Sequence, residues 1–285
     1  MIFVLFQTRG SDQCSGSFLM SIARLVMFLA MMVNVGCQSD SSILMNDVNS
    51  DSLCLGSCPY VKRGNILVER PIYHLSNNPR TKFADWVAYR VGPSSIGPSQ
   101  PRVWRKDPDL PDSATLEPAD YQGASRELET DRGHQVPLAS FSNTSSWEQL
   151  NYLSNITPQS LYLNRGAWKI LEQKVRDMTL DRYRYTWVLT GPVYEKRLDD
   201  LPEADESHRI PSGYWKVIAI LRDDMIETVS FFFDQNTPAD ADPCDYSVDL
   251  SLVNYKTRLD LLEDVTLNIS SNGQDIKEDL GCNKK

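Results

Sequence analysis

Five apolar segments with the composition of β-strands are the feature that most constrains the fold. Each is rich in Val, Ile, Tyr, Trp or Phe and is bounded by turn-forming residues, as strands usually are. The segments are NILVERPIYHL (65–75), FADWVAYRV (83–91), RYTWVLTGPVY (184–194), YWKVIAIL (214–221) and TVSFFFD (228–234). Because helices do not alternate regularly with these strands, we predict an α+β fold with a central antiparallel sheet flanked by helices.

Helices are predicted at two main places. The clearer one covers GAWKILEQKVRDM (166–178), where Trp168, Leu171 and Val175 recur at spacings of three and four and so share one face. A second is expected near LVNYKTRLDLLEDV (252–265), and PADYQGASRE (118–127) is expected to form one short helical turn. The stretch from Gly92 to Pro118, rich in Pro, Ser and Asp, is predicted to be a long loop, and such loops in compact domains are usually functional.

The overall charge of the chain is negative. Its 285 residues carry 29 Lys and Arg against 38 Asp and Glu, a formal net charge of −9. At long range such a protein repels polyanions, which counts against a tight nucleic-acid binder. An enzyme that acts on nucleic acid through a locally basic cleft remains compatible with this charge, because affinity follows the local phosphate contacts.

The N-terminal segment predicts export. After Arg24, residues Leu25 to Gly36 are uncharged and apolar, about as long as the core of a signal peptide and too short to span a bilayer comfortably. We interpret residues 1–37 as an export signal, and translation from Met20 would give it a short basic start. A buried core helix is the weaker alternative, because the segment has no amphipathic period. Residues 38–53 are polar and are predicted to be a flexible leader.

Cysteine usage agrees with an oxidising compartment. Beyond the N-terminal Cys14 and Cys37, four cysteines remain: Cys54, Cys58, Cys244 and Cys282. They are an even set, for which the sequence permits three pairings. A zinc site is the competing interpretation, and it is disfavoured because no histidine stands near either group in the sequence. Two outcomes are open for Cys37, a lipid anchor on the exported chain or removal with the signal.

Polar side chains that could perform hydrolysis gather between residues 131 and 176. They are His134, Asn151, Asn155, Gln159, Asn164, Glu172 and Arg176. His134 has a side chain suited to act as a base near neutral pH. The amide oxygen of Asn164 is a hard ligand suited to Mg²⁺, whose waters Glu172 could orient. Arg132 and Arg102 are candidates to grip phosphate oxygens and to stabilise charge in the transition state.

Each of these residues also has an ordinary structural explanation. A lone histidine beside a glycine is more often structural than catalytic. Asn164 could cap the helix that follows it. Glu172 and Arg176 stand four residues apart and could form a surface ion pair of little energetic value. Asp131 could form a salt bridge with an arginine, and no chemical role is assigned to it.

Several separate motifs together resemble the DNA/RNA non-specific endonucleases, also known as ββα-metal or His-Me finger nucleases. The motifs are DRGHQVPLASF, WEQLNYLSNITPQ, LNRGAWKILEQKVR, VLTGPVYE, IPSGYWKVI and FFFDQNTP. The resemblance runs from about Cys54 to Cys282, and the segment 245–281 gives it little support. It implies a ββα-metal nuclease fold and a single nuclease domain over residues 54–285.

The resemblance implies a role for each matched residue. His134 matches the general base that deprotonates the attacking water, and Asn164 matches the protein ligand of one Mg²⁺, for which Mn²⁺ could substitute. Glu172 matches the carboxylate that holds water around the metal. The other matched residues are Arg102, Arg132 and Arg176, which bind phosphate and stabilise the transition state, Asn155, assigned to the catalytic set, and Asn151 and Gln159, assigned to substrate binding.

The resemblance also carries expectations beyond the site. It implies the disulfides Cys54–Cys58 and Cys244–Cys282, and it is consistent with a homodimer, because relatives form one. The function expected is hydrolysis of phosphodiester bonds in DNA and RNA by an exported, secreted or periplasmic enzyme, with 5′-phosphorylated products. Two alternatives stay open: an exported nucleic-acid-binding lipoprotein that does not cleave, and a hydrolase of another phosphodiester.

Overall fold

The computed structural model describes residues 52–222, 225–262, 268–270 and 273–282. The predicted export signal, the start at Met20, the anchor at Cys37 and the leader up to residue 51 lie outside these residues. None of the helices in the described ranges is both long and apolar enough to cross a membrane.

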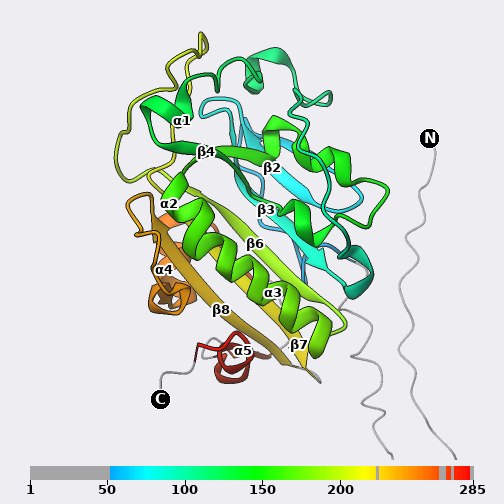
Figure 1. Ribbon diagram of the computed structural model, residues 1–285. Coiled ribbons are helices and arrows are strands. Elements are labelled where there is room, and N and C mark those ends of the chain that lie inside the picture. The colour runs from blue at the N-terminus through cyan, green and yellow to red at the C-terminus, as the bar shows by residue number, and fades with distance from the viewer. Residues whose placement is uncertain (1–51, 223–224, 263–267, 271–272, 283–285) are drawn as a thin grey trace, which may run out of the picture. The chain divides into compact units, whose positions relative to one another are not determined.

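A mixed sheet forms the centre of the fold and confirms the α+β prediction (Figure 1). Its strands lie in the order β1–β2–β3–β6–β7–β8–β10, and β9 also pairs with β8. Neighbouring strands are antiparallel except β8 and β10, which run parallel. The strands are β1 (Ile66–Glu69), β2 (His74–Asn78), β3 (Phe83–Val91), β6 (Thr186–Val193), β7 (Gly213–Arg222), β8 (Met225–Asp234), β9 (Ser247–Val248) and β10 (Asn268–Ser270).

Four of the five predicted strand segments form one strand each. The segment 65–75 instead contains β1 and the start of β2, which pair as a hairpin. The chain turns at Pro71, where the backbone N–H of Arg70 donates to the carbonyl of Tyr73 at 2.9 Å. Proline fixes φ for such a turn, and the chain reverses direction there. Apolar residues stand on both sides of the turn, so the sequence showed one continuous segment.

Helices cover both faces of the sheet. On β7, Tyr214 and Ile218 belong to the same core as Leu171 of α3 (Lys169–Asp181), which lies along the sheet in Figure 1. Trp215 alternates with these residues and packs instead with Val253 of α4 (Leu250–Thr257). Successive strand residues point to opposite faces, so one strand supplies both layers of the core.

The helices depart from the predicted bounds for identifiable reasons. Residues Asn164–Trp168 form a π-helical turn after the short α2 (Leu161–Leu163), and Gly166 has non-helical φ and ψ of −98° and −117°. The regular helix α3 therefore begins at Lys169 rather than at residue 166. Helix α4 ends at Thr257 because Arg258 adopts a left-handed φ of 54°, and residues 263–265 of the predicted helix lie outside the described ranges. The remaining helices are α1 (Ala124–Glu127), at the predicted helical turn, and α5 (Gln274–Asp279).

Two short strands that the sequence did not predict form a separate ribbon. Strand β4 (Thr130–His134) pairs antiparallel with β5 (Ile156–Ser160). In chain order β4 and β5 precede α3, so the three elements form a ββα unit. Its helix α3 lies across one face of the central sheet (Figure 1). The fold class implied by the resemblance is thereby confirmed.

The long loop 92–118 is fixed by specific contacts. The buried Asp107 forms an ion pair with Arg70 and accepts a hydrogen bond from the Ser154 hydroxyl. Two backbone hydrogen bonds then join Arg105 to the segment before β5: its N–H donates to the carbonyl of Asn151 at 3.1 Å, and its carbonyl accepts from Leu153 at 2.9 Å. The loop therefore holds a defined position although it contains no strand longer than a single bridge.

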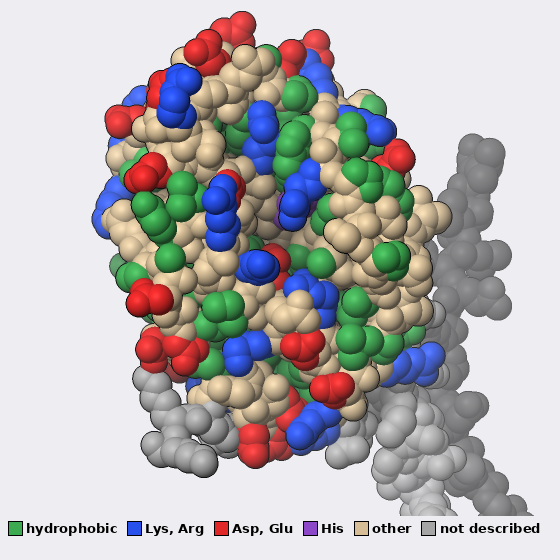
Figure 2. All heavy atoms as spheres, in the orientation of Figure 1, with side chains coloured by type: hydrophobic (Ala, Val, Ile, Leu, Met, Phe, Trp, Pro, Cys, Tyr) green, Lys and Arg blue, Asp and Glu red, His purple; other side chains and the backbone are tan. Residues whose placement is uncertain are grey.

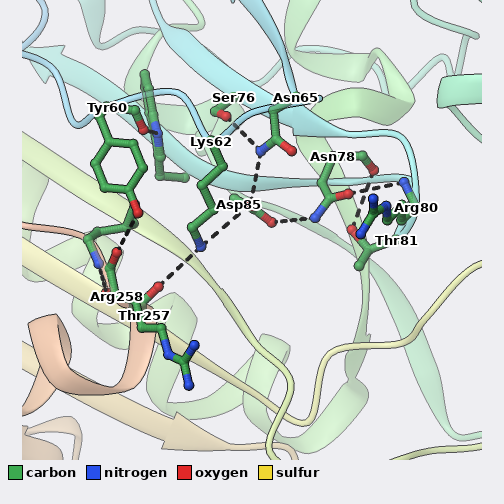
Figure 3. Close-up of polar contacts among 12 residues, drawn as sticks. Tyr60, Lys62, Asn65, Ser76, Asn78, Arg80, Thr81, Asp85, Thr257 and Arg258 are labelled. Carbon is green, nitrogen blue, oxygen red and sulfur yellow. Dashed lines mark hydrogen bonds and ion pairs between the residues drawn. The ribbon is translucent and has the colours of Figure 1, made fainter.

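A polar network joins the N-terminal end of the described chain to α4 (Figure 3). The Lys62 ammonium lies 3.7 Å from the Asp85 carboxylate and donates to the carbonyl of Thr257 at 3.1 Å. Asp85 also accepts hydrogen bonds from the Asn65 and Asn78 amides at 2.9 and 3.0 Å. This network connects β3 to the far end of α4 on the side of the sheet opposite α3.

Both disulfides implied by the resemblance are present, Cys54–Cys58 and Cys244–Cys282, with sequence separations of 4 and 38 residues. The second one fastens the segment that follows α5 to the turn before β9. A crosslink restricts the unfolded chain more strongly when the loop that it closes is longer.

We predict that replacing Cys244 and Cys282 together by alanine lowers the free energy of unfolding by about 4 kcal/mol, against about 2 kcal/mol for the matched pair of alanines at Cys54 and Cys58. Urea denaturation of both double variants and the wild-type chain measures the difference. Equal losses, or a larger loss for the short loop, would contradict the loop-entropy account.

Candidate active site

A pocket of about 660 Å³ lies between the ββα unit and the long loop. Figure 2 shows a hollow in this face with Lys and Arg side chains around it. The residues that line it include Arg102, Trp104, Tyr121, Asp131, Arg132, His134, Asn164, Arg165, Lys169, Glu172 and Arg176. Five cationic side chains therefore face two carboxylates, so the pocket is locally positive although the chain is acidic.

His134 is the last residue of β4 and faces the pocket. Its ring centroid lies 5.3 Å from that of Trp104, a residue of the long loop. Burial, assisted by the positive charge of Arg102 and opposed by Asn151, lowers the pKa of His134 to about 4. Its Nε2 atom is buried and makes no hydrogen bond within the described chain. The imidazole is therefore neutral at pH 7 and has a nitrogen lone pair free to accept a proton.

Gly133 leaves room for the side chain of Gln159, which lies against it on the neighbouring strand β5. A Cβ atom on Gly133 would lie 2.5 Å from Oε1 and 2.7 Å from Cβ of Gln159. Real side chains essentially never approach so closely, so a larger residue would displace β5 or Gln159. The glycine of the DRGH motif thus serves packing next to the histidine.

Arg132 shares the pocket side of β4 with His134, because residues two apart on a strand face the same way. Its guanidinium lies 5.7 Å from the ring centroid of Trp104 and 5.2 Å from that of Tyr121. It also donates to the carbonyl of Pro118 at 3.0 Å. The two aromatic rings and this hydrogen bond hold the positively charged guanidinium group of Arg132 against the pocket wall.

Asn164 begins the π-helical turn and lines the pocket next to β4, the strand of His134. Its amide nitrogen donates to Oδ2 of Asp131 at 2.9 Å. Asp131 also accepts two hydrogen bonds from Arg165, at 2.8 and 2.7 Å. Burial alone would raise the pKa of Asp131, but the hydrogen bonds from Arg165 and Asn164 outweigh it and hold that pKa below its ordinary value.

Glu172 lies on α3 among positive charges. Burial raises the pKa of its carboxyl group, and the charges of Lys216 and Arg176 oppose that rise. Its Oε1 atom is buried and makes no hydrogen bond in the ranges that the structure describes. Arg176, 7% exposed, donates to Oε1 of Gln173 at 2.8 Å.

Lys216 of β7 lies beneath this group and was not foreseen. It is 1% exposed, and its ammonium lies 4.1 Å from the ring centroid of Trp168, one helical turn before Glu172. Burial lowers the pKa of Lys216 to about 8, against the opposing effect of the Glu172 carboxylate.

Three of the proposed site amides lie behind the pocket wall rather than along it. Asn151, Asn155 and Gln159 are each at most 1% exposed. Asn155 accepts from the N–H of Val136 at 2.8 Å and donates to the carbonyls of Val136 and Leu150, so it fixes the backbone that follows His134. The roles predicted for these amides toward substrate stay predictions.

Two pocket aromatics, Trp104 and Tyr121, were also missed. Trp104 stands two residues after Arg102 in PRVW, and Tyr121 precedes α1, so neither is adjacent in sequence to His134. A loop composition carries no information about which strand the loop covers, and only the spatial arrangement identifies them.

The pocket offers oxygen donors that suit a hard metal ion. Among described residues, clusters of three His, Cys, Asp or Glu side chains occur only elsewhere, at Cys54–Cys58–His74 and at Asp120–Asp205–Glu206. The first includes a disulfide, so its sulfurs are not available as thiolate ligands. Within the pocket, the amide oxygen of Asn164 and the carboxylate of Glu172 are suited to a hard divalent cation.

Comparison with known proteins identifies the family. Residues 60–268 match the family model of the DNA/RNA non-specific endonucleases. The chain belongs to this family. It is 42% identical over 236 residues to the nuclease of Serratia marcescens, an alignment that covers 80% of this chain and 88% of that protein.

More distant relatives share a smaller part of the chain. The nuclease of Syncephalastrum racemosum is 29% identical, with coverage of 67% of this chain and 61% of that protein. Human mitochondrial endonuclease G is 31% identical, with coverage of 47% and 44%. The crystal structure of the EndoG/EndoGI complex superposes with a TM-score of 0.61 over 70% of this chain and 86% of that chain, at 22% identity, which is a likeness of fold.

We predict that His134 of this family member titrates near pH 4 in metal-free protein, far below an ordinary histidine. Catalysis that needs its neutral form should then persist below pH 6 and be lost as the pH falls through about 4. The substitution Arg102→Gln removes a repelling positive charge and should raise the His134 pKa by roughly one pH unit.

NMR titration resolves this, because the chain has only three histidines. Arg197→Gln, at an exposed arginine outside the pocket lining, is the matched control and should leave the His134 titration unchanged. Titration of wild-type His134 near pH 6.5 would show that burial does not lower its pKa. An unchanged pKa in the Arg102→Gln variant would show that the charge of Arg102 does not contribute.

Proposed function

We propose that the chain is a sugar-non-specific endonuclease that hydrolyses phosphodiester bonds of single- and double-stranded DNA and RNA and leaves 5′-phosphates. Membership of the nuclease family supports the reaction class. The observation that carries the proposal is the neutral His134, with its unpaired Nε2, in a pocket lined by five cationic side chains. A base and a phosphate-binding surface thus share one cavity.

We propose Mg²⁺ as the cofactor, with Mn²⁺ able to replace it. The donor set fits: Asn164 offers a neutral amide oxygen, and Glu172 a carboxylate whose Oε1 has no hydrogen-bond partner in the described chain. Such hard oxygen donors are what Mg²⁺ prefers, and it commonly retains several waters. Bound there, the ion would supply positive charge to the phosphate and its leaving oxygen. Glu172 would orient water next to it by accepting hydrogen bonds.

His134 is proposed to accept the proton of the attacking water through Nε2. The low pKa keeps the ring neutral, and Trp104 limits its movement on one side. Arg102, Arg132 and Arg176 would hold non-bridging phosphate oxygens and stabilise the charge that develops during in-line displacement. In this proposal, the rate increase comes from holding the phosphate in position and from stabilising its charge, as well as from proton transfer to His134.

The absence of sequence preference follows from the kind of contacts available. Guanidinium and ammonium groups in the pocket recognise phosphate, which carries no sequence information. The positive charge is confined to the pocket while the whole chain carries −9, so long-range repulsion favours release of the cleaved polymer. Export to an oxidising compartment is part of the proposal, and the two disulfides support it.

We expect the wild-type chain to cut plasmid DNA and RNA with Mg²⁺ and to stop when EDTA is added. His134→Ala should lower kcat by about 10³-fold, within the range typical for loss of a general base. His74→Asn changes a histidine outside the pocket lining and should have less than a twofold effect. The products should accept a 5′ label from polynucleotide kinase only after phosphatase treatment.

Undiminished cutting by the His134→Ala variant would rule out the proposed base. Hydrolysis of a small phosphodiester without cleavage of either polymer would indicate a hydrolase of another substrate class. Binding of DNA and RNA without any cleavage would reject the enzymatic function altogether.

A further inference from the structure

Asp131 is an acidic residue of the pocket to which neither the sequence nor the proposed reaction gives a task. It lies on β4, three residues before His134, and contacts residues 164 and 165 across the pocket wall. The side chain of Asp131 is 19% exposed, whereas that of its partner Arg165 is 64% exposed. Asp131 is therefore placed to act on the wall of the pocket rather than on bulk solvent.

The Asn164 amide has two ends of nearly equal shape and opposite chemistry. Its oxygen accepts hydrogen bonds or binds a cation, whereas its NH₂ group only donates. A cation can bind this residue only when the oxygen faces the pocket. The rotamer alone does not decide between the two orientations, so a neighbouring group has to.

An ionised carboxylate makes that decision, because it accepts hydrogen bonds and cannot donate them. Oδ2 of Asp131 lies 2.9 Å from Nδ2 of Asn164. If the amide were rotated by 180°, its oxygen would face the carboxylate oxygen at a similar distance, and the two would repel each other. The bond therefore directs the amide oxygen away from Asp131.

Arg165 holds Asp131 in the orientation that this bond requires. Its Nε and Nη2 donate to the two carboxylate oxygens at 2.8 and 2.7 Å, a paired geometry that fixes the plane of the carboxylate. The same Oδ2 atom receives both Nε of Arg165 and Nδ2 of Asn164. The three side chains thus form one unit.

The backbone of the π-helical turn is equally restricted. A Cβ atom on Gly166 would lie 2.5 Å from the carbonyl oxygen of Ala239, so only glycine permits this close contact. On the other side, the N–H of Leu161 donates to the carbonyl of Glu129 at 2.9 Å, which ties the start of α2 to the residue before β4. Both ends of the segment that carries Asn164 are held, so the side-chain amide is the part left to orient.

We propose that Asp131 is a positioning residue that, locked by Arg165, orients the Asn164 amide so that its oxygen faces the pocket and can bind a divalent cation. This inference rests on the proposed function, in which Asn164 is the protein ligand. It assigns the DRGH motif a second task, performed by its first residue: the motif supplies both the base and the orientation of the metal ligand.

Mn²⁺ binding, followed by electron paramagnetic resonance of the free ion, tests this without relying on activity. Asp131→Asn replaces the obligate acceptor by a group that can also donate, so both amide orientations become available. Mn²⁺ affinity should fall about tenfold or more, as is typical when a group that orients a ligand is lost. Asp199→Asn makes the same change of charge at an exposed position outside the pocket lining and should leave the affinity unchanged.

The exchange variant Asp131→Asn/Asn164→Asp provides the rescue. It restores a donor opposite an obligate acceptor with the polarity reversed, and a carboxylate at position 164 offers oxygen in either orientation. Mn²⁺ affinity should recover to within about threefold of wild type or exceed it. Circular dichroism and urea denaturation of each variant would establish that it is folded before binding is compared.

The outcomes separate this inference from the proposed function. Wild-type affinity in the Asp131→Asn variant would overturn the role of Asp131 while leaving Asn164 as the ligand. No Mn²⁺ binding by the wild-type chain would reject the proposed ligand and this role together. Weak binding by a folded Asp131→Asn variant without recovery in the exchange variant would also overturn it. The exchange variant has the charge of the wild type and offers oxygen at position 164 in either orientation, so amide orientation would then not be what limits binding.

Discussion

The packing of α3 against the central sheet is the contact on which the site depends. Leu171 and Val175 of α3, and Trp168 directly before it, are each at most 3% exposed and form the buried face that packs on the sheet. Burying such side chains contributes about 2 kcal/mol each, enough to fix the rotation of the helix about its axis. That rotation determines where Glu172 and Arg176 stand, so the buried apolar residues of α3 position the two charged residues that line the pocket.

Much of the fold could be predicted, because strands and helices that are buried on one or both faces leave a periodic apolar pattern. The predicted strand at 83–91 coincides with β3, and the stripe on α3 was recognised by its spacing. The ribbon β4–β5 was not predicted, because its short strands are rich in polar residues that serve the pocket. The start of α3 was misplaced because the backbone at Gly166 responds to a distant contact with Ala239, which local propensity does not encode.

The candidate site was predicted less evenly. His134 was found because histidine is rare in this chain and suited to act as a base, and Asn164 because its motif resembles that of the family. Both residues line one pocket. Lys216 gave no signal, because one lysine in a strand is normally exposed and only the burial of β7 on both faces makes it exceptional. Asp131 was taken for an ordinary ion-pair partner, since the direction of a neighbouring amide cannot be inferred from sequence spacing.

The anchor at Asp107 divides the long loop into two parts that can vary separately. The part from Gly92 to Arg105 carries Arg102 and Trp104 to the pocket, and the part after Asp107 leads through a 3₁₀ turn toward α1. Because the ion pair with Arg70 is buried between them, a change in length after Asp107 does not have to move Arg102 and Trp104. Insertions or deletions after Asp107 are therefore compatible with the pocket only when the Pro118 carbonyl still reaches Arg132.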